Sequence, residues 1–424
     1  MLDIKYIREN KELIRQTGID KNFPIDVDLL LELDRKIVDL NKSLDELKTE
    51  RNKKSEINPK LSGEEKMKEI TYVKELKEKI SSLEADLAPI KEEFDLLMLK
   101  VPNPCLPEVP VGKDDTDNVE VKKWGEIRSF DFTPKDHITL GEELDLMEFA
   151  RASKIAGSRT YYLRNDAVLL EMAICRYVVD KLVSKGFTPM SVPVMVKDIA
   201  MKGTGYFPLG KEQAYAITED DLYLVGTSEV SLVSYHNGET LSKDNLPILY
   251  AGYSNCFRRE AGTYGKDTKG LYRVHQFTKI EQVAIIEADM DKQREIHDFL
   301  LSNSEEVLQD FKIPYRVVSV CTGDIGIGQV RKHDIEAWMP SRNAYCETHS
   351  CSSFNDFQAR RSNIKYKDSD GTTKYCYTLN NTAIASPRIL IPILENYQNE
   401  DGSITIPEVL VPYMGGKTKI EAKK

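Results

Sequence analysis

The chain has 424 residues, of which 30% are charged and 41% hydrophobic, and its formal net charge is −10. This length predicts two or three domains, and the acidic balance excludes a protein that coats nucleic acid indiscriminately while leaving room for a local basic patch. No apolar run approaches the ~18 residues of a membrane span. Because the start of the chain also lacks a secretory pattern, we expect a cytosolic protein without a membrane partner. Seven scattered cysteines without a Cys-x-x-Cys pair suggest neither a disulfide framework nor a zinc site.

Two long segments, 28–57 and 64–100, carry apolar residues at alternating spacings of three and four. This spacing is typical of the seam of a coiled coil, and the break at Asn58-Pro59 and Ser62-Gly63 predicts an antiparallel helical hairpin. Helices of roughly 45–55 Å are longer than a globular core needs, so we expect a projecting arm. The basic cluster near its tip is, by itself, typical of a solvated helix end; it contains Lys48, Arg51, Lys53 and Lys54.

Four prolines between 102 and 110, followed by Gly112, mark the end of this arm. Proline prevents helix continuation and stiffens a joint. We therefore predict an N-terminal domain over 1–102, a linker over 103–112 and a second domain over 113–424. Alternating strand patterns and helical patterns mix in the second domain, which predicts an α+β fold around an antiparallel sheet. The chain has neither a Gly-x-Gly-x-x-Gly nor a complete Walker-type loop, so ATP binding would need another architecture.

The most informative stretch consists of two predicted strands, 256–260 and 273–281, joined by a polar loop, 262–270. A strand has a side-chain period of two, so each predicted strand places its alternate residues on one face. Guanidinium groups bind phosphate oxygens bidentately and a flat ring suits a base, which favours a nucleotide site. The alternative is a solvated charged face. The residues on the shared faces are Arg258 and Glu260 in the first strand, and Arg273, His275, Phe277, Lys279 and Glu281 in the second.

Three further segments carry candidate residues. Glu347 and Ser350 follow a strand-like segment, and a carboxylate and a hydroxyl at this spacing suit a hard cation that bridges phosphates. The six histidines show no paired spacing for a transition metal, so we interpret His349 as structural. Thr227 or Ser228 suits the N-terminus of a helix, where either would act as a cap. Arg388 precedes a helical segment, 389–397, and alone is typical of the start of a surface helix.

Together these segments resemble the class II aminoacyl-tRNA synthetases. Phe257-Arg258-x-Glu260, a loop, and Arg273-x-x-x-Phe277-x-x-x-Glu281 resemble motif 2 of that class, and their detailed wording is similar to the bacterial-type seryl-tRNA synthetases. An apolar helical stretch at 167–184, followed by 185–193, resembles motif 1. The segment 378–388 resembles motif 3, although the usual glycines are missing. The resemblance extends over nearly the whole chain.

The resemblance implies a ligase that activates L-serine with ATP as seryl-adenylate and transfers it to the 3′ end of tRNA(Ser), and of tRNA(Sec) where the host makes that tRNA. It also implies a class II catalytic core, Mg²⁺ bound with ATP, no zinc, and a homodimer built through motif 1. The arm would bind tRNA through its basic cluster. Two alternatives are a ligase that charges a carrier protein, which would lack the arm, and a non-catalytic paralogue, which would lack Arg258, Glu281 or Arg388.

The resemblance also implies roles for individual residues. Arg258 would hold both the serine carboxylate and the α-phosphate, Phe277 would stack on adenine, and Glu281 would contact serine. Glu347 and Ser350 would hold Mg²⁺. The ATP-binding residues would be Arg258, Arg259, Glu260, Arg273, Val274, Phe277, Glu347, Thr348, His349, Ser350 and Arg388, with Glu260 on the adenine side and Arg273 and Arg388 on the terminal phosphates. The serine-binding residues would be Thr227, Ser228, Glu229, Arg258, Glu281, Asn380 and Thr382.

Overall fold

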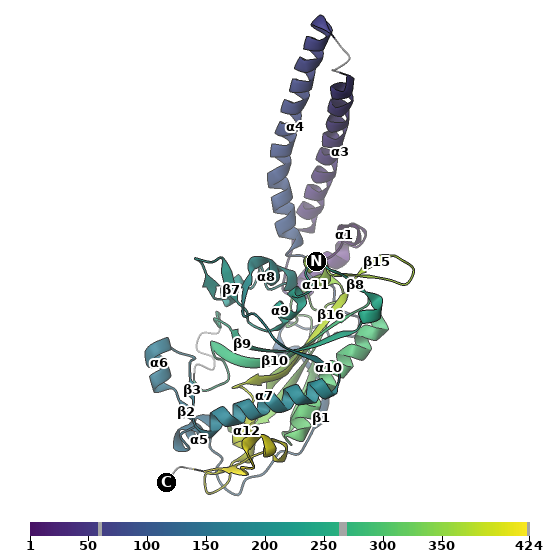
Figure 1. Ribbon diagram of the computed structural model, residues 1–424. Coiled ribbons are helices and arrows are strands. Elements are labelled where there is room, and N and C mark those ends of the chain that lie inside the picture. The colour runs from purple at the N-terminus through teal and green to yellow at the C-terminus, as the bar shows by residue number, and fades with distance from the viewer. Residues whose placement is uncertain (58–61, 263–268, 422–424) are drawn as a thin grey trace. The chain divides into compact units, whose positions relative to one another are not determined.

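The computed structural model describes residues 1–57, 62–262 and 269–421 (Figure 1). The chain divides into two compact units. One consists of Leu2–Ile19 and Phe23–Pro102, and the other of Met1, Asp20–Asn22 and Asn103–Lys424. In the described part of the chain, no helix is both long and apolar enough to span a bilayer.

The N-terminal unit is helical, with α1 (Ile4–Glu9) and α2 (Lys11–Asp20) before two long helices, α3 (Val27–Ile57) and α4 (Gly63–Met98). Lys48 of α3 forms an ion pair with Glu84 of α4, and Lys54 forms one with Glu69, so the two helices run antiparallel. The predicted helical hairpin is therefore confirmed. Its seam buries apolar side chains that include Leu30, Leu33, Leu44, Val73, Leu76 and Ile80. The predicted break at Asn58-Pro59 lies outside the described residues.

The second unit is built on an eight-stranded sheet in the order β1-β11-β12-β13-β16-β10-β9-β4. All neighbours pair antiparallel except β4 and β9, which pair parallel. This confirms the predicted α+β class with an antiparallel core. In sheet order the strands are β1 (Val119–Trp124), β11 (Tyr315–Ser319), β12 (Arg331–Met339), β13 (Ala344–Ser353), β16 (Tyr377–Ser386), β10 (Gln276–Ile286), β9 (Ile248–Phe257) and β4 (Thr188–Ser191).

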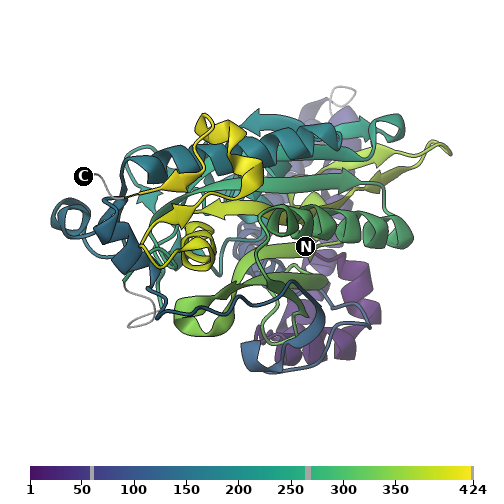
Figure 2. The same ribbon diagram turned by 90° about the horizontal axis from the view of Figure 1, so that it is seen from below.

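Two helices, α7 (Asp166–Ser184) and α10 (Met290–Asp310), lie along one face of this sheet (Figure 2). Apolar residues recur along α7 at spacings of three and four, and those facing the sheet are buried, among them Leu170, Ile174 and Val178. The chain turns from α7 into β4 through Gly186, whose φ of +91° favours glycine. The predicted helix-to-strand element at 167–193 is thus confirmed.

Shorter elements surround the sheet. The helices are α5 (His137–Glu143), α6 (Ala150–Ala156), α8 (Asp198–Thr204), α9 (Glu229–Ser234), α11 (Phe357–Ser362) and α12 (Leu390–Tyr397). The small sheets are β2 (Met147–Glu148) with β3 (Tyr162–Leu163); β5 (Met195–Lys197), β7 (Leu222–Leu224) and β6 (Ala216–Ile217); β15 (Thr373–Tyr375), β14 (Lys365–Lys367) and β8 (Thr240–Ser242); and β17 (Ile404–Thr405) with β18 (Lys419–Ile420). The predicted helix after Arg388 is confirmed as α12.

Candidate active site

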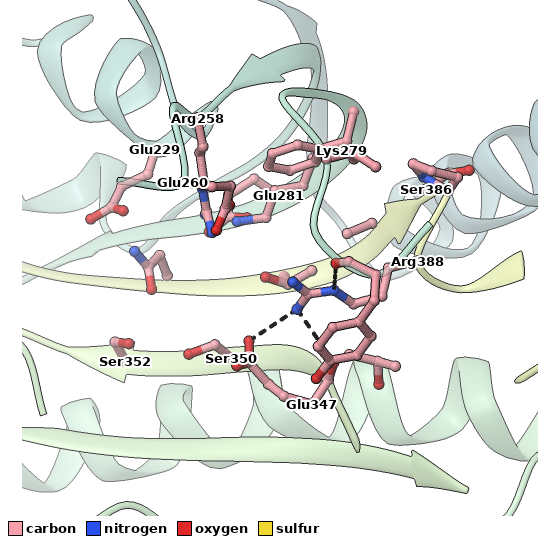
Figure 3. Close-up of a pocket in the computed structure, with 18 of the residues that line it drawn as sticks. Glu229, Arg258, Glu260, Lys279, Glu281, Glu347, Ser350, Ser352, Ser386 and Arg388 are labelled. Carbon is pink, nitrogen blue, oxygen red and sulfur yellow. Dashed lines mark hydrogen bonds and ion pairs between the residues drawn. The ribbon is translucent and has the colours of Figure 1, made fainter. Parts of the chain in front are cut away.

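A cavity of about 320 Å³ lies on the face of the large sheet opposite to α10 (Figure 3). The side-chain period of β10 sets this arrangement. Lys279 and Glu281 line the cavity. The next residue, Gln282, points to the opposite face of the sheet, where its side-chain amide donates to Ser304 of α10. The cavity brings together twelve of the predicted ATP- and serine-binding residues: Glu229, Arg258, Glu260, Val274, Phe277, Glu281, Glu347, Thr348, Ser350, Asn380, Thr382 and Arg388.

The strand predictions for the hairpin need a correction. β9 ends at Phe257 and β10 begins at Gln276, so Arg258–Glu260 and Arg273–His275 lie beyond the ladder. Two polar contacts hold the two segments together beyond the ladder. The amide of Arg258 donates to the carbonyl of His275, and the His275 ring contacts the carbonyl of Arg258 at 2.9 Å. Val274, rather than His275, therefore lines the cavity. Most of the predicted loop, 263–268, lies outside the described residues.

Arg258 reaches into the cavity from the end of β9. Its Nε donates to the carbonyl of Gly226 at 3.2 Å, and its guanidinium carbon lies 5.2 Å from the centre of the Phe277 ring. The carbonyl orients the guanidinium, while the remaining N–H groups are available to a ligand. An anion-binding group and a flat apolar ring therefore lie side by side.

Three buried ionisable groups form one part of the wall. Lys279 and Glu281 form an ion pair, and the ammonium of Lys279 also donates to the hydroxyl of Thr227 at 3.2 Å. Glu229 accepts hydrogen bonds from Tyr206 and Gln358. Burial, with help from the charge of Glu281, raises the pKa of Glu229 to about 7. A ligand cation would therefore meet two carboxylates and offset their desolvation.

Arg388 and Glu347 form another part of the wall. Arg388 donates through Nε to the carbonyl of Tyr272 at 3.1 Å and packs on the Tyr272 ring, while its Nη1 lies 3.4 Å from the Glu347 carboxylate. Partial loss of water at the cavity wall would raise the pKa of Glu347, although its side chain is still 46% exposed. The nearby cations, Arg388 and Lys332 first among them, nevertheless hold that pKa below its ordinary value. Glu347 is thus kept ionised beside a guanidinium that suits phosphate.

Glu347 and Ser350, both on β13, fit a divalent cation. An ionised carboxylate and a hydroxyl are the hard oxygen donors that Mg²⁺ prefers, and Mg²⁺ takes its other ligands from phosphates and water. Among the described residues, no group of three or more His, Cys, Asp or Glu side chains is arranged to hold a metal without such help. The donor set therefore suits a cation that arrives with a nucleotide.

Five predicted residues do not line the cavity: Thr227, Ser228, Arg259, Arg273 and His349. Ser228 is buried, and its hydroxyl lies 2.7 Å from that of Ser254, so a direct contact with serine does not fit this placement. It makes no side-chain cap on α9 either. Arg273 lies 3.6 Å from Glu260, which does face the cavity. Burial lowers the pKa of His349 to about 3, and its ring contacts the hydroxyl of Thr348, which agrees with a structural role.

Several lining residues were not predicted from the sequence: Tyr206, Tyr272, Gln329, Lys332 and Ser352. Lys332 pairs with Ser352 across β12 and β13, and Ser352 pairs with Asn380 across β13 and β16, so the three form a row across the sheet. No local motif marks Gln329 or Lys332, because only the register of distant strands brings them to the site. Lys279 also lines the cavity, and its alternation with Phe277 and Glu281 had already predicted that it shares their strand face.

A buried lysine holds the backbone behind Gln329. The ammonium of Lys21 donates to the carbonyls of Asn103, Ile327 and Gln329 at 2.7–3.2 Å, and burial lowers its pKa to about 8. Lys21 is only 1% exposed. The side chain of Gln329 in turn donates to Ser352. Lys21 therefore helps to hold Gln329 in place at one edge of the cavity wall.

Comparisons with known proteins agree over the full chain. Residues 1–105 match the seryl-tRNA synthetase N-terminal domain, and residues 215–397 match the tRNA synthetase class II core domain (G, H, P, S and T). The serine–tRNA ligase of Deinococcus radiodurans is 45% identical over 98% of both chains, and that of Dictyoglomus thermophilum is 47% identical over 100% of both.

Solved structures give the same result. The seryl-tRNA synthetase of Pyrococcus horikoshii complexed with ATP superposes with a TM-score of 0.91 at 40% identity over 100% of both chains. The cytoplasmic serine–tRNA ligase of Naegleria fowleri in complex with AMP gives a TM-score of 0.86 at 33% identity, over 100% of this chain and 99% of that one. Both relatives carry an adenine nucleotide.

Proposed function

Because the chain belongs to the seryl-tRNA synthetases, which are class II aminoacyl-tRNA synthetases, we propose that it activates L-serine with ATP as seryl-adenylate and transfers the seryl group to the 3′ end of tRNA(Ser). tRNA(Sec) is a second substrate where the host makes it. One observation carries this proposal: a single cavity unites Arg258, Phe277 and Glu281 with Glu347 and Arg388.

In the activation step, the serine carboxylate attacks the α-phosphorus of ATP and pyrophosphate leaves. The two reactants are both anions and repel each other, and Arg258 neutralises both from its position beside Phe277. Phe277 stacks on adenine and so fixes the nucleotide relative to Arg258. The reaction needs no covalent enzyme nucleophile, because positioning and charge neutralisation lower the barrier.

The serine pocket lies around the buried ionisable groups. Glu281 and Glu229 accept hydrogen bonds from the serine ammonium and hydroxyl, and Thr382 and Asn380 complete the polar wall. Thr227 contributes through Lys279, whose ammonium it binds. Alanine lacks the hydroxyl and would leave buried polar groups unpaired, so this wall discriminates against it.

The pyrophosphate end lies around Arg388. Its guanidinium binds the γ-phosphate, while Arg273 acts from beside Glu260. Glu347 and Ser350 are the residues that would hold Mg²⁺. When bound, the cation supplies neutralisation of the charge on the departing pyrophosphate. Thr348 supports Ser350 and Glu347 from within β13, since its hydroxyl donates to the carbonyl of Ile335 on β12.

The transfer step requires tRNA, and the α3–α4 hairpin is the proposed reader of tRNA(Ser) through its basic residues Lys48, Arg51, Lys53 and Lys54. A homodimer is also part of the proposal. α7, in the motif 1 element, exposes apolar side chains that a second subunit would cover: Val168 is 37%, Leu169 52% and Met172 63% exposed.

Pyrophosphate exchange tests the activation step. The enzyme should exchange labelled pyrophosphate into ATP with serine present and tRNA absent, and alanine or threonine should not replace serine. A non-catalytic paralogue would show no exchange with any amino acid. A carrier-protein ligase would show exchange without charging any tRNA, so the exchange assay is paired with a measurement of tRNA charging.

A further inference from the structure

A buried carboxylate, Asp334, lies beside Ser350 beneath the cavity. β12 and β13 pair with Asp334 directly opposite Ser350 and Lys332 directly opposite Ser352. Residues that are directly opposed in an antiparallel pair have Cβ atoms about 5 Å apart and share one face of the sheet. Because Ser350 lines the cavity, Asp334 faces the same side.

The hydrogen bonding of Asp334 is half complete. Its Oδ2 lies 2.9 Å from the ammonium of Lys332. Asp334 is only 5% exposed. Its Oδ1 is buried and has no hydrogen-bond partner among the described residues. A buried acceptor without a donor costs free energy, so this oxygen needs a donor nearby.

Ser350 is placed to supply that donor, because it is the hydroxyl residue directly opposite Asp334 on β13. Burial raises the pKa of Asp334 to about 6, while the ammonium of Lys332 and the hydroxyl of Ser350 act against that rise. A hydroxyl has one proton and two lone pairs and turns freely about its C–O bond. When the proton points to Oδ1 of Asp334, both lone pairs of the Ser350 oxygen are available on the cavity side, where Glu347 also lies.

We propose that Asp334 is a positioning residue for the cation site, because it accepts the Ser350 proton and so turns the Ser350 oxygen toward a divalent cation held with Glu347. This inference rests on the proposed function. Asp334 does not line the cavity, so it acts through Ser350 rather than as a ligand. Lys332 occupies the other carboxylate oxygen and offsets a second negative charge close to Glu347.

The experiment measures Mn²⁺ affinity by the electron paramagnetic resonance of free Mn²⁺, with a non-hydrolysable ATP analogue present. Loss of a carboxylate that orients a ligand typically weakens metal binding about 10–100-fold. Asp334→Ala should show a loss of this size. Asp334→Asn keeps an acceptor oxygen without the charge, so it should lie between Asp334→Ala and wild type. Asp298→Asn is the matched control, because Asp298 pairs with Arg331 at 3.3 Å and does not line the cavity, and it should bind Mn²⁺ as wild type does.

A double-mutant cycle separates positioning from a general structural effect. If Asp334 acts through Ser350, then Ser350→Ala combined with Asp334→Ala should bind Mn²⁺ no more weakly than Ser350→Ala alone. Wild-type affinity in Asp334→Ala, or effects that multiply in the double variant, would overturn the inference. If Asp334→Ala does not fold, Asp334→Asn, which keeps the volume of the side chain, carries the test and should bind Mn²⁺ more weakly than wild type.

Glu347→Gln distinguishes this inference from the proposed function. A strong loss of Mn²⁺ binding in Glu347→Gln, with none in Asp334→Ala, would reject the role of Asp334 and leave the cation site in place. Unchanged binding in Glu347→Gln would reject the proposed cation site itself, and the inference with it.

Discussion

The guanidinium carbon of Arg258 lies 5.2 Å from the centre of the Phe277 ring. The first residue follows the end of β9 and the second lies near the start of β10, so the turn of the hairpin brings them together. In the proposed function, this contact places the group that would bind the α-phosphate next to the ring that would stack on the base.

Arg258→Ala should abolish activation while the protein stays folded. The single guanidinium neutralises two anions, and loss of one positioned electrostatic group costs ~10²-fold or more in rate. Serine-dependent pyrophosphate exchange measures the effect, and far-ultraviolet circular dichroism checks the fold. Arg258→Lys keeps the charge without the planar fork and should recover only part of the activity. Near wild-type exchange in Arg258→Ala would show that this residue has no role in activation.

Glu281→Ala should raise the serine KM strongly and leave ATP affinity nearly unchanged. Glu281 is four residues beyond Phe277 on the same strand face, roughly 13 Å along the strand, and so lies past the base. Glu281→Gln should lose the charge-assisted part of the interaction, which is about twice as strong as a neutral hydrogen bond. Serine KM and kcat are measured beside ATP affinity for both variants. A selective loss of ATP affinity, with unchanged serine parameters, would show that Glu281 contacts the nucleotide rather than serine.

Glu229 should make serine activation depend on pH near neutrality. Burial raises its pKa to about 7, so the fraction of ionised carboxylate that is ready to accept the serine ammonium increases through that pH. The value of kcat/KM for serine, which reports on the free enzyme, should rise with pH through about 7. Glu229→Gln cannot ionise and should remove this rise. A rise of the same size in the variant would assign it to another group.

Removal of the distal arm should separate activation from charging. The variant lacks residues 38–90, and a short turn joins Ile37 to Lys91, which keeps the ion pair of Asp34 with Arg8. Pyrophosphate exchange should stay close to wild type, because no lining residue of the cavity comes from this segment. tRNA charging should be lost. Charging at the parental rate would show that the arm does not read tRNA, and Lys53→Glu with Lys54→Glu tests the tip in the intact arm.

Local patterns predicted the elements that obey a simple period. The seam of α3 and α4 and the apolar face of α7 follow helical spacing, and the alternation of Phe277, Lys279 and Glu281 gave their common face. The strand ends were predicted less well, because charged residues such as Arg258 and Arg273 continue the alternation where the ladder has already stopped. Two contacts replace the ladder there, one between the Arg258 amide and the His275 carbonyl and one between the His275 ring and the Arg258 carbonyl, and no sequence period encodes them.

The site residues divide in the same way. Motif spacing found Arg258, Glu347 and Arg388, because each belongs to one short segment. Lys332 and Asp334 come from β12, and only the pairing of β12 with β13 places them beside Ser350 and Ser352. Ser228 stays a prediction: the resemblance implied a serine contact, whereas its buried hydroxyl lies 2.7 Å from that of Ser254 and the residue does not line the cavity.

Charging of tRNA(Ser) with labelled serine tests the central claim most directly. The purified protein, with ATP, Mg²⁺ and a tRNA(Ser) transcript, should form acid-precipitable seryl-tRNA, and a tRNA for another amino acid should stay uncharged. Alanine and threonine in place of serine should give no product. If the protein exchanges pyrophosphate with serine but charges no tRNA(Ser), or charges it with another amino acid, the assignment is contradicted.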